Sequence, residues 1–186
     1  MAALQGMQII ALTDHNSCRN CPAAMKHGEE YGVIVIPGME LTTSEEVHVV
    51  CLFPTLDDAL SFDAYVYDHI LPIKNKEHIF GRQQIMDKED HVTGNVERLL
   101  ISATDISFDR IFALVSSYHG IAYPAHIDKT TTSLLSNLGF VPPDSTFLCA
   151  EIHNMGNLHR IQKEHPYFLQ CNIVSSSDAH YLEDIN

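Results

Sequence analysis

The sequence of 186 residues predicts an α/β domain built on a parallel sheet, and two observations support this fold class. Short apolar runs typical of strands alternate with amphipathic stretches typical of helices over most of the chain. Repeated β-loop-α units of this kind imply a parallel sheet, which is either open or closed into a barrel. The length suits one domain with a sizeable core and is too short for two.

The elements follow one another with few interruptions. Strands are expected at 8–12, 33–36, 47–53, 121–124, 149–152 and 172–175, and helices at 17–31, 56–70, 107–119, 130–138 and 158–164. Pro37 and Gly38 are expected to end the second strand, and Gly32 and Gly120 to stop the helices before them. Residues 72–104 break the pattern, and we interpret them as an insertion that carries a hairpin.

Composition excludes several classes of protein. The chain has 11 basic and 24 acidic residues and a formal charge of −13, which argues against an extended nucleic-acid surface unless bound cations reverse the field locally. No apolar run reaches the length of a membrane span, and the N-terminus lacks a signal-like pattern, so we expect a cytoplasmic protein. The odd number of cysteines fits a reducing compartment, and the Cys18-x-x-Cys21 pair suits packing better than a redox or metal role.

Polar residues with metal-binding side chains stand next to the predicted strands. One follows each of the first, second and fourth strands, two follow the last, and one lies inside the third; in chain order they are His15, Glu40, His48, His126, Asp178 and His180. In parallel α/β folds the carboxyl ends of the strands open on one face, where functional groups collect. Histidine and carboxylate side chains are ligands for zinc, manganese or iron, and a carboxylate can bridge two ions.

Each of these residues also has an ordinary structural explanation. His15 suits a turn, Glu40 a turn cap or a solvated position, and His48 a satisfied histidine on a half-buried strand. Six such coincidences beside strands favour a common site instead. His153 directly follows a strand and is a candidate substrate contact, whereas the remaining histidines are expected at the surface.

Four segments resemble the motifs of the PHP (polymerase and histidinol phosphatase) family, in the same order along the chain. They are Ile-Ile-Ala-Leu-Thr-Asp-His-Asn at 9–16, Pro-Gly-Met-Glu at 37–40 followed by His48, Pro-Ala-His-Ile-Asp at 124–128 and Ser-Asp-Ala-His at 177–180. The resemblance implies a distorted (β/α)7 barrel whose two or three divalent metal ions hydrolyse phosphate esters. It also implies that all six residues named above are metal ligands, with Glu40 as the bridge, and that Glu40, Asp178 and His180 take part in catalysis.

The sequence departs from the family at one point. The family opens with a strand ending in His-x-His, and this chain contains no His-x-His. We therefore expect one metallohydrolase domain over 1–186 that lacks the first strand and ligand loop at its N-terminus. Exposed sheet edges would then favour self-association.

Substrate and mechanism stay open at this stage. A nucleotide, an oligonucleotide or a small-molecule phosphate would suit the resemblance, and Lys129 and Arg160 are candidate phosphate anchors. One alternative is a degenerate PHP module that binds metal structurally without catalysis. Another is an amidohydrolase-like enzyme that cleaves a C–N bond, although such enzymes use a lysine at a strand end and only Lys129 is near the six ligands.

Overall fold

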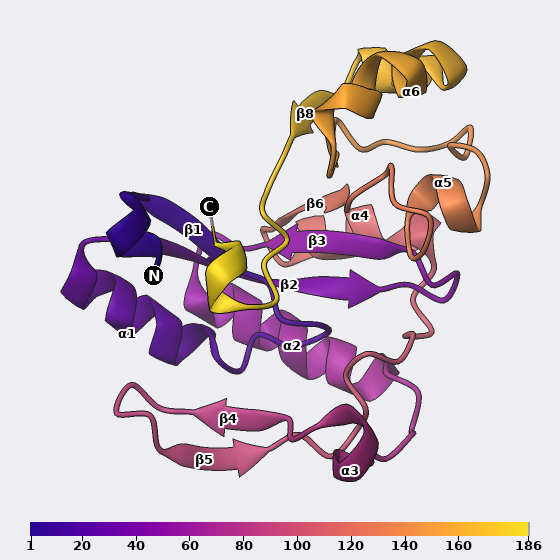
Figure 1. Ribbon diagram of the computed structural model, residues 1–186. Helices are drawn as coiled ribbons and strands as arrows, with labels where there is room; N and C mark the ends of the chain where they lie inside the picture. Colours follow the sequence, from indigo (N-terminus) through magenta and orange to yellow (C-terminus); the bar gives the residue numbers. More distant parts are fainter. Residues whose placement is uncertain (186) are drawn as a thin grey trace.

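The computed structural model describes residues 1–185 and confirms the mixed α/β class (Figure 1). The strands are β1 (Ile9–Leu12), β2 (Ile34–Thr42), β3 (His48–Leu52), β4 (Gln84–Met86), β5 (Val92–Asn95), β6 (Ile121–Pro124), β7 (Cys149–Glu151) and β8 (Asn172–Val174). The α-helices are α1 (Cys21–Tyr31), α2 (Leu56–His69), α3 (Glu77–Phe80), α4 (Phe108–Ser117), α5 (Leu134–Asn137) and α6 (Leu158–Glu164). Short 3-10 turns η1 (Ala2–Gln5), η2 (Met155–Asn157), η3 (Pro166–Leu169) and η4 (Leu182–Asp184) complete the chain.

The central sheet has the strand order β1-β2-β3-β6 and is mixed. β1 pairs parallel with β2, whereas β3 runs antiparallel to both β2 and β6. The prediction of an all-parallel sheet is therefore wrong at β3. The cause is the connection Thr43–Val47, because five residues make a turn but cannot form the crossover that a parallel neighbour needs.

β2 is longer than predicted, because Pro37 and Gly38 lie inside it and do not end it. The Pro37 carbonyl accepts a hydrogen bond from the Phe53 amide at 3.0 Å, so the missing N–H leaves this side of the pairing intact. Gly38 allows β3 to come close, since a Cβ there would lie 2.5 Å from the Cys51 carbonyl oxygen. The strand continues to Thr42 and carries Glu40 within it.

The other strands form two smaller sheets. β7 and β8 are parallel, and the Ile127 amide donates to the Glu151 carbonyl at 2.8 Å, which joins the end of β7 to the residues just after β6. β4 and β5 make the hairpin predicted within 72–104. Across residues 1–185 these three sheets do not close into a ring, so the (β/α)7 barrel is not confirmed.

Helix α1 starts four residues later than predicted. Ser17 does not cap it, because the Ser17 hydroxyl donates to the buried Asp63 carboxylate at 3.1 Å. Asn20 is the N-cap residue and Pro22 occupies the first turn, where a missing N–H costs nothing. Cys18 and Cys21 are buried and their thiols donate to the Gly38 carbonyl, which supports the packing interpretation of the pair.

The main core lies between the central sheet and helices α2 and α4. Met39 and Val49 from the sheet, Phe62 from α2 and Ile111 from α4 are completely buried. Thr55 caps α2 by accepting the Asp58 amide at 3.1 Å. This packing fixes the sheet whose edge carries the polar residues discussed next. Within residues 1–185 no helix has both the length and the apolar character to cross a bilayer.

Candidate metal centre

One edge of the central sheet gathers the histidines and the glutamate. β1, β2 and β6 run in one direction, so their carboxyl ends share this edge, and the antiparallel β3 begins there. His15 follows β1 and His126 follows β6, while His48 is the first residue of β3. The reversed direction of β3 is thus what brings a residue at the start of a strand together with residues that follow strands.

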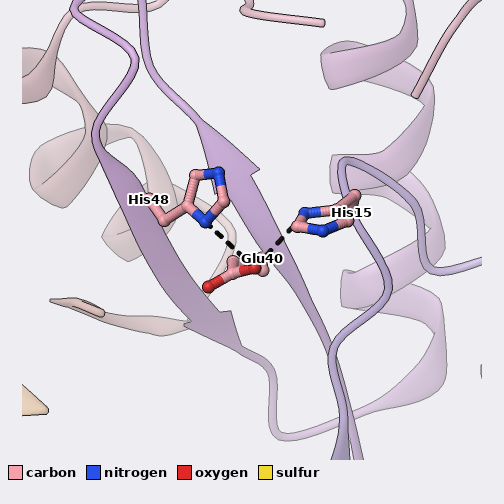
Figure 2. Close-up of side chains that lie close together, drawn as sticks. All are labelled: His15, Glu40 and His48. Atoms are coloured by element: carbon pink, nitrogen blue, oxygen red, sulfur yellow. Dashed lines mark ion pairs between the residues drawn. The ribbon is translucent and has the colours of Figure 1, made fainter. Parts of the chain in front are cut away.

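Glu40 is the centre of the cluster (Figure 2). Its Oε2 lies 3.2 Å from Nδ1 of His15 and 3.2 Å from Nδ1 of His48, and its Oε1 lies 3.3 Å from Nε2 of His126. The His126 Nε2 is also 3.3 Å from the His48 Nδ1. One carboxylate is therefore surrounded by three imidazole rings that come from three different segments.

Burial and charge prepare these side chains to bind a cation at neutral pH. Burial alone would raise the pKa of Glu40, but the hydrogen bonds from His126 and His48 and the nearby imidazole charges lower it far below its usual value of 4.5. Burial lowers the pKa of His15 from 6.5, and the neighbouring His48 and His180 lower it further against the pull of Glu40. An ionised carboxylate beside a neutral imidazole is the protonation state that metal binding requires.

The nitrogen atoms of the cluster are poorly satisfied by the protein itself. Within the described chain the Nδ1 atoms of His15 and His126 are buried and have no hydrogen-bond partner. One ligand atom each from His15, Glu40 and His48 lies within 4.8 Å of the others, close enough for one ion to reach all three. Unsatisfied buried nitrogens next to a carboxylate fit a divalent ion, because coordination would use the lone pairs that are left over.

Asp178 and His180 lie beside this cluster but are not part of the close group. The His180 ring centroid is 5.9 Å from that of His15, and the His180 Nδ1 is hydrogen bonded to the Asp178 carbonyl oxygen at 2.9 Å. The Asp178 carboxylate is paired with the Lys129 ammonium group. The structure therefore brings His15, Glu40, His48 and His126 together and holds Asp178 in an ion pair next to them.

Two cavities open at the cluster. The smaller, of about 250 Å³, is bounded by His15, Glu40, Asp178 and His180 among others. The larger, of about 570 Å³, extends from Glu40 along β1 and includes Tyr123. The larger volume lies within the range of small-molecule sites.

The backbone is strained where it carries the site. Asn16, His126 and Asp178 all have left-handed φ angles, of 49°, 28° and 48°. This conformation is uncommon for residues other than glycine and tends to occur at functional positions. His126 and Asp178 are themselves predicted ligands, and Asn16 directly follows the predicted ligand His15.

A family profile described as the PHP domain matches residues 1–164, which is most of the chain. The chain belongs to the PHP family. A search of curated protein sequences finds no match. The family assignment agrees with the motif order along the chain and covers four of the six predicted ligands, up to His126, while Asp178 and His180 lie beyond the matched residues.

Solved structures of similar fold include two of endonuclease Q and one of a phosphoesterase. The lesion-specific endonuclease Q of Pyrococcus furiosus has a TM-score of 0.56 and a sequence identity of 18%. Endonuclease Q in complex with a 27-mer duplex that carries an abasic lesion has a TM-score of 0.59 and a sequence identity of 17%. In both, 96% of this chain aligns with 42% of the other, so this PHP chain spans about two fifths of their length. A protein of Bifidobacterium adolescentis described as a metal-dependent phosphoesterase has a TM-score of 0.56 and a sequence identity of 15%, with 97% of this chain aligned to 80% of that protein.

Two acidic residues of this PHP chain were missed by the sequence analysis. Asp14 borders both cavities, and burial raises its pKa although a hydrogen bond from Asn20 and the charge of His15 oppose this. Glu151 is buried at the end of β7, and burial also raises its pKa. Asp14 stands in the 9–16 motif directly before His15, which was the residue selected there, and Glu151 lies within a predicted strand and in none of the four motifs.

The secondary candidates have different outcomes. Lys129 is at the site through its pair with Asp178, whereas Arg160 pairs with Glu164 on the exposed face of α6. His153 is exposed, and its backbone amide donates to the Asp128 carboxylate at 2.7 Å. Among the histidines expected at the surface, His69 is half-buried and stacks on Tyr65 at 4.0 Å.

Proposed function

We propose that this PHP chain is a metal-dependent phosphoesterase whose ions are held at the edge of the central sheet. The observation that carries the proposal is the contact of three histidines with one buried, ionised glutamate. Such a set of nitrogen and carboxylate ligands suits zinc, manganese or iron. Two or three ions are expected from the family resemblance, with Glu40 as the bridging carboxylate.

Each proposed ligand has a place in this scheme. His15, His48 and His126 would hold the first ion with Glu40, and Asp178 and His180 would contribute to a neighbouring position across the smaller cavity. When bound, divalent ions supply an activated water and neutralise charge on the phosphate oxygens.

The chain's own side chains would do the rest. The Lys129 ammonium group is paired with Asp178 and would donate to a phosphate oxygen of a substrate if Asp178 served as a metal ligand. Since the His180 Nδ1 donates to a backbone carbonyl, its Nε2 is left with a lone pair that can bind an ion or accept a proton. Glu40, Asp178 and His180 are therefore our proposed catalytic residues.

We infer a small phosphate ester or a nucleotide as the substrate. The net charge of −13 opposes binding of a long polyanion away from the ions, and the larger cavity has the volume of a small-molecule site. One of the similar structures is an endonuclease bound to duplex DNA, so oligonucleotides belong in the test. We also propose that the chain is one metallohydrolase domain of distorted (β/α)7 type, in which 72–104 is an insertion.

Two other functions are outcomes of the same test. A degenerate PHP module would bind metal without turnover. A C–N hydrolase would need a lysine as a bridging ligand, and the pairing of Lys129 with Asp178 disfavours that role.

The deciding experiment combines metal analysis with a substrate panel. The chain is purified anaerobically with manganese, iron or zinc supplied, and its metal content is measured. It is then assayed with p-nitrophenyl phosphate, nucleoside monophosphates, short oligonucleotides and a cyclic amide, before and after chelation. The variant Glu40→Gln removes the central charge, and Glu29→Gln, an exposed acid paired with Lys26 on α1, is the matched control.

We expect bound metal, phosphatase activity that chelation abolishes and added metal restores, and a loss of both in Glu40→Gln but not in Glu29→Gln. A chain that takes up none of the three metals would disprove the proposal. Metal without turnover of any phosphate ester would identify the degenerate module, and hydrolysis of the amide alone would identify a C–N hydrolase.

A further inference from the structure

Asn16 makes unusual use of its side chain. It is buried, it follows His15 directly, and it has a left-handed φ of 49°. Its amide nitrogen donates to the Leu100 carbonyl at 2.7 Å and to the Ser102 carbonyl at 2.8 Å, while its amide oxygen accepts the Thr42 amide at 2.9 Å. Every bond is to the backbone of a segment distant in sequence, so this one residue joins three parts of the chain.

The backbone of Asn16 fixes His15 relative to Glu40. The backbone amide of Asn16 donates to the Glu40 carbonyl at 2.9 Å, and the backbone amide of Glu40 donates to the Asp14 carbonyl at 3.1 Å. These two bonds enclose His15, which forms a parallel bridge with Glu40 beyond the end of β1. The left-handed turn at Asn16 then directs the chain away from β2 and allows its amide group to reach Thr42.

The side chain of Asn16 acts on the third ligand through Thr42. Thr42 is the last residue of β2 and is the register partner of His48 at the start of β3. The Thr42 carbonyl accepts both the amide and the hydroxyl of Thr104, at 2.9 and 2.8 Å. Asn16 and Thr104 therefore hold the N–H and the C=O of the same residue at the point where β2 and β3 meet.

We propose that Asn16 is the positioning residue of the metal centre, where it sets the spacing between His15, Glu40 and His48. Through it the 72–104 segment supports the site, because its last residues supply the carbonyl groups that hold the Asn16 amide. This inference rests on the proposed function, since it assigns Asn16 a role toward the ion that those ligands would bind.

The chain contains a matched control for this role. The side-chain amide of Gln83 donates to the carbonyls of Val96 and Arg98, at 3.0 and 2.7 Å, and accepts the Leu100 amide at 2.9 Å. It therefore makes the same three kinds of bond as Asn16, two donations to carbonyl groups and one acceptance from a backbone amide. Its partners Val96, Arg98 and Leu100 lie in the same extended segment as Leu100 and Ser102, the carbonyl partners of Asn16. Within residues 1–185 the Gln83 side chain makes no hydrogen bond to a segment that carries a proposed ligand and reaches Asn16 only by way of Leu100, so its removal should cost comparable stability while the side-chain bonds of Asn16 remain.

The test uses cobalt(II) alone as the probe, because its visible absorption reports the number and geometry of its ligands. Cobalt is titrated into the metal-free chain, into Asn16→Gly and into Gln83→Ala, and thermal melts are recorded beside each titration. Glycine keeps the left-handed turn and removes only the side-chain bonds. Asn16→Asp, which keeps the acceptor for the Thr42 amide and places a carboxylate against the two carbonyls, carries the same test if Asn16→Gly does not fold.

We expect Asn16→Gly to bind cobalt at least tenfold more weakly, with an altered absorption spectrum, as is typical when the support of a ligand is lost. Gln83→Ala should lower the melting temperature by a similar amount and keep the parent's spectrum and affinity. If Asn16→Gly matches the parent within twofold, or if both variants change alike, Asn16 does not position the centre. If the parent itself binds no cobalt, the proposed metal site falls, and this inference falls with it.

Discussion

Gly38 is the position where a single methyl group should separate two of the proposed ligands, Glu40 and His48, without touching either. Gly38 pairs with Leu52 of β3, and along β2 it lies two residues before Glu40. An alanine Cβ there would lie 2.5 Å from the Cys51 carbonyl oxygen and 2.8 Å from the Leu52 Cδ2. Because one of these atoms belongs to the backbone, β2 and β3 must move apart to accommodate Gly38→Ala.

The size of the effect follows from these distances. Ordinary contact begins at 3.4 Å, so the strands must separate by about 0.9 Å near the substitution. Metal–ligand distances tolerate only about 0.2 Å, so the Glu40–His48 spacing of 3.2 Å would no longer suit a shared ion. Overpacking of this kind costs about 1–3 kcal/mol, which corresponds to a fall in Tm of roughly 2–12 °C for a chain of this size.

Gly28→Ala is the matched control. Its Cβ would lie 2.5 Å from the Val33 carbonyl oxygen and 2.6 Å from the Val35 Cγ2, which is a clash of the same size on α1, at the opposite end of β2. Thermal melts and isothermal titration with manganese are measured on both variants. We expect both to lose stability and only Gly38→Ala to lose manganese affinity, by at least tenfold. Equal manganese affinity in the two variants would refute the argument that the β2–β3 spacing sets the site.

Three further outcomes are expected. Lys129→Met should raise KM for a phosphomonoester more than it lowers kcat and change stability by about 1 kcal/mol at most, because the pair with Asp178 is partly exposed; an unchanged KM in steady-state kinetics would exclude Lys129 as a phosphate anchor. Because the folded pKa of Glu40 is below its unfolded value of 4.5, its contribution to stability is present above pH 4.5 and lost as the pH falls through the folded pKa. Urea unfolding of the metal-free chain at several pH values should show this loss. If the unfolding free energy of Glu40→Gln depended on pH in the same way as that of the parent, the assignment to Glu40 would be wrong. Phe62→Ala should cost about 3–5 kcal/mol, because the ring is fully buried against Tyr118 at 5.3 Å; a loss under about 1 kcal/mol by urea unfolding would show that this core collapses around the gap.

Local patterns predicted most of the elements, and the errors arise where pairing depends on more than the local sequence. β6 and α6 have the predicted bounds, since both are short and well delimited. β2 extends past Pro37 and Gly38 because the approach of β3 uses the missing side chain, which no local rule for strand ends takes into account. The orientation of β3 was predictable from the length of its connection, but the alternation of strands and helices elsewhere outweighed that signal.

The candidate site was predictable as a set and less so as a geometry. The placement of His15 and His126 after strands is enough to predict that they meet, because the carboxyl ends of parallel strands lie along the same side of a sheet. The pairing of Asp178 with Lys129 depends on the path of the chain after β8, for which the sequence gives no periodic signal. No local pattern points to Asn16, because two of its side-chain partners are 84 and 86 residues away along the chain.

The wide sequence spacing of the four clustered residues has a kinetic consequence. His15 and His126 meet only when β1, β2, β3 and β6 are all assembled, so a chain that has formed part of the sheet presents an incomplete set of the proposed ligands. An ion that binds only the assembled sheet should slow unfolding and leave the refolding rate almost unchanged. Chelation of such an ion would then shorten the lifetime of the native state far more than it would delay its formation. A bound ion would stabilise the fold only after the chain had reached that fold without it.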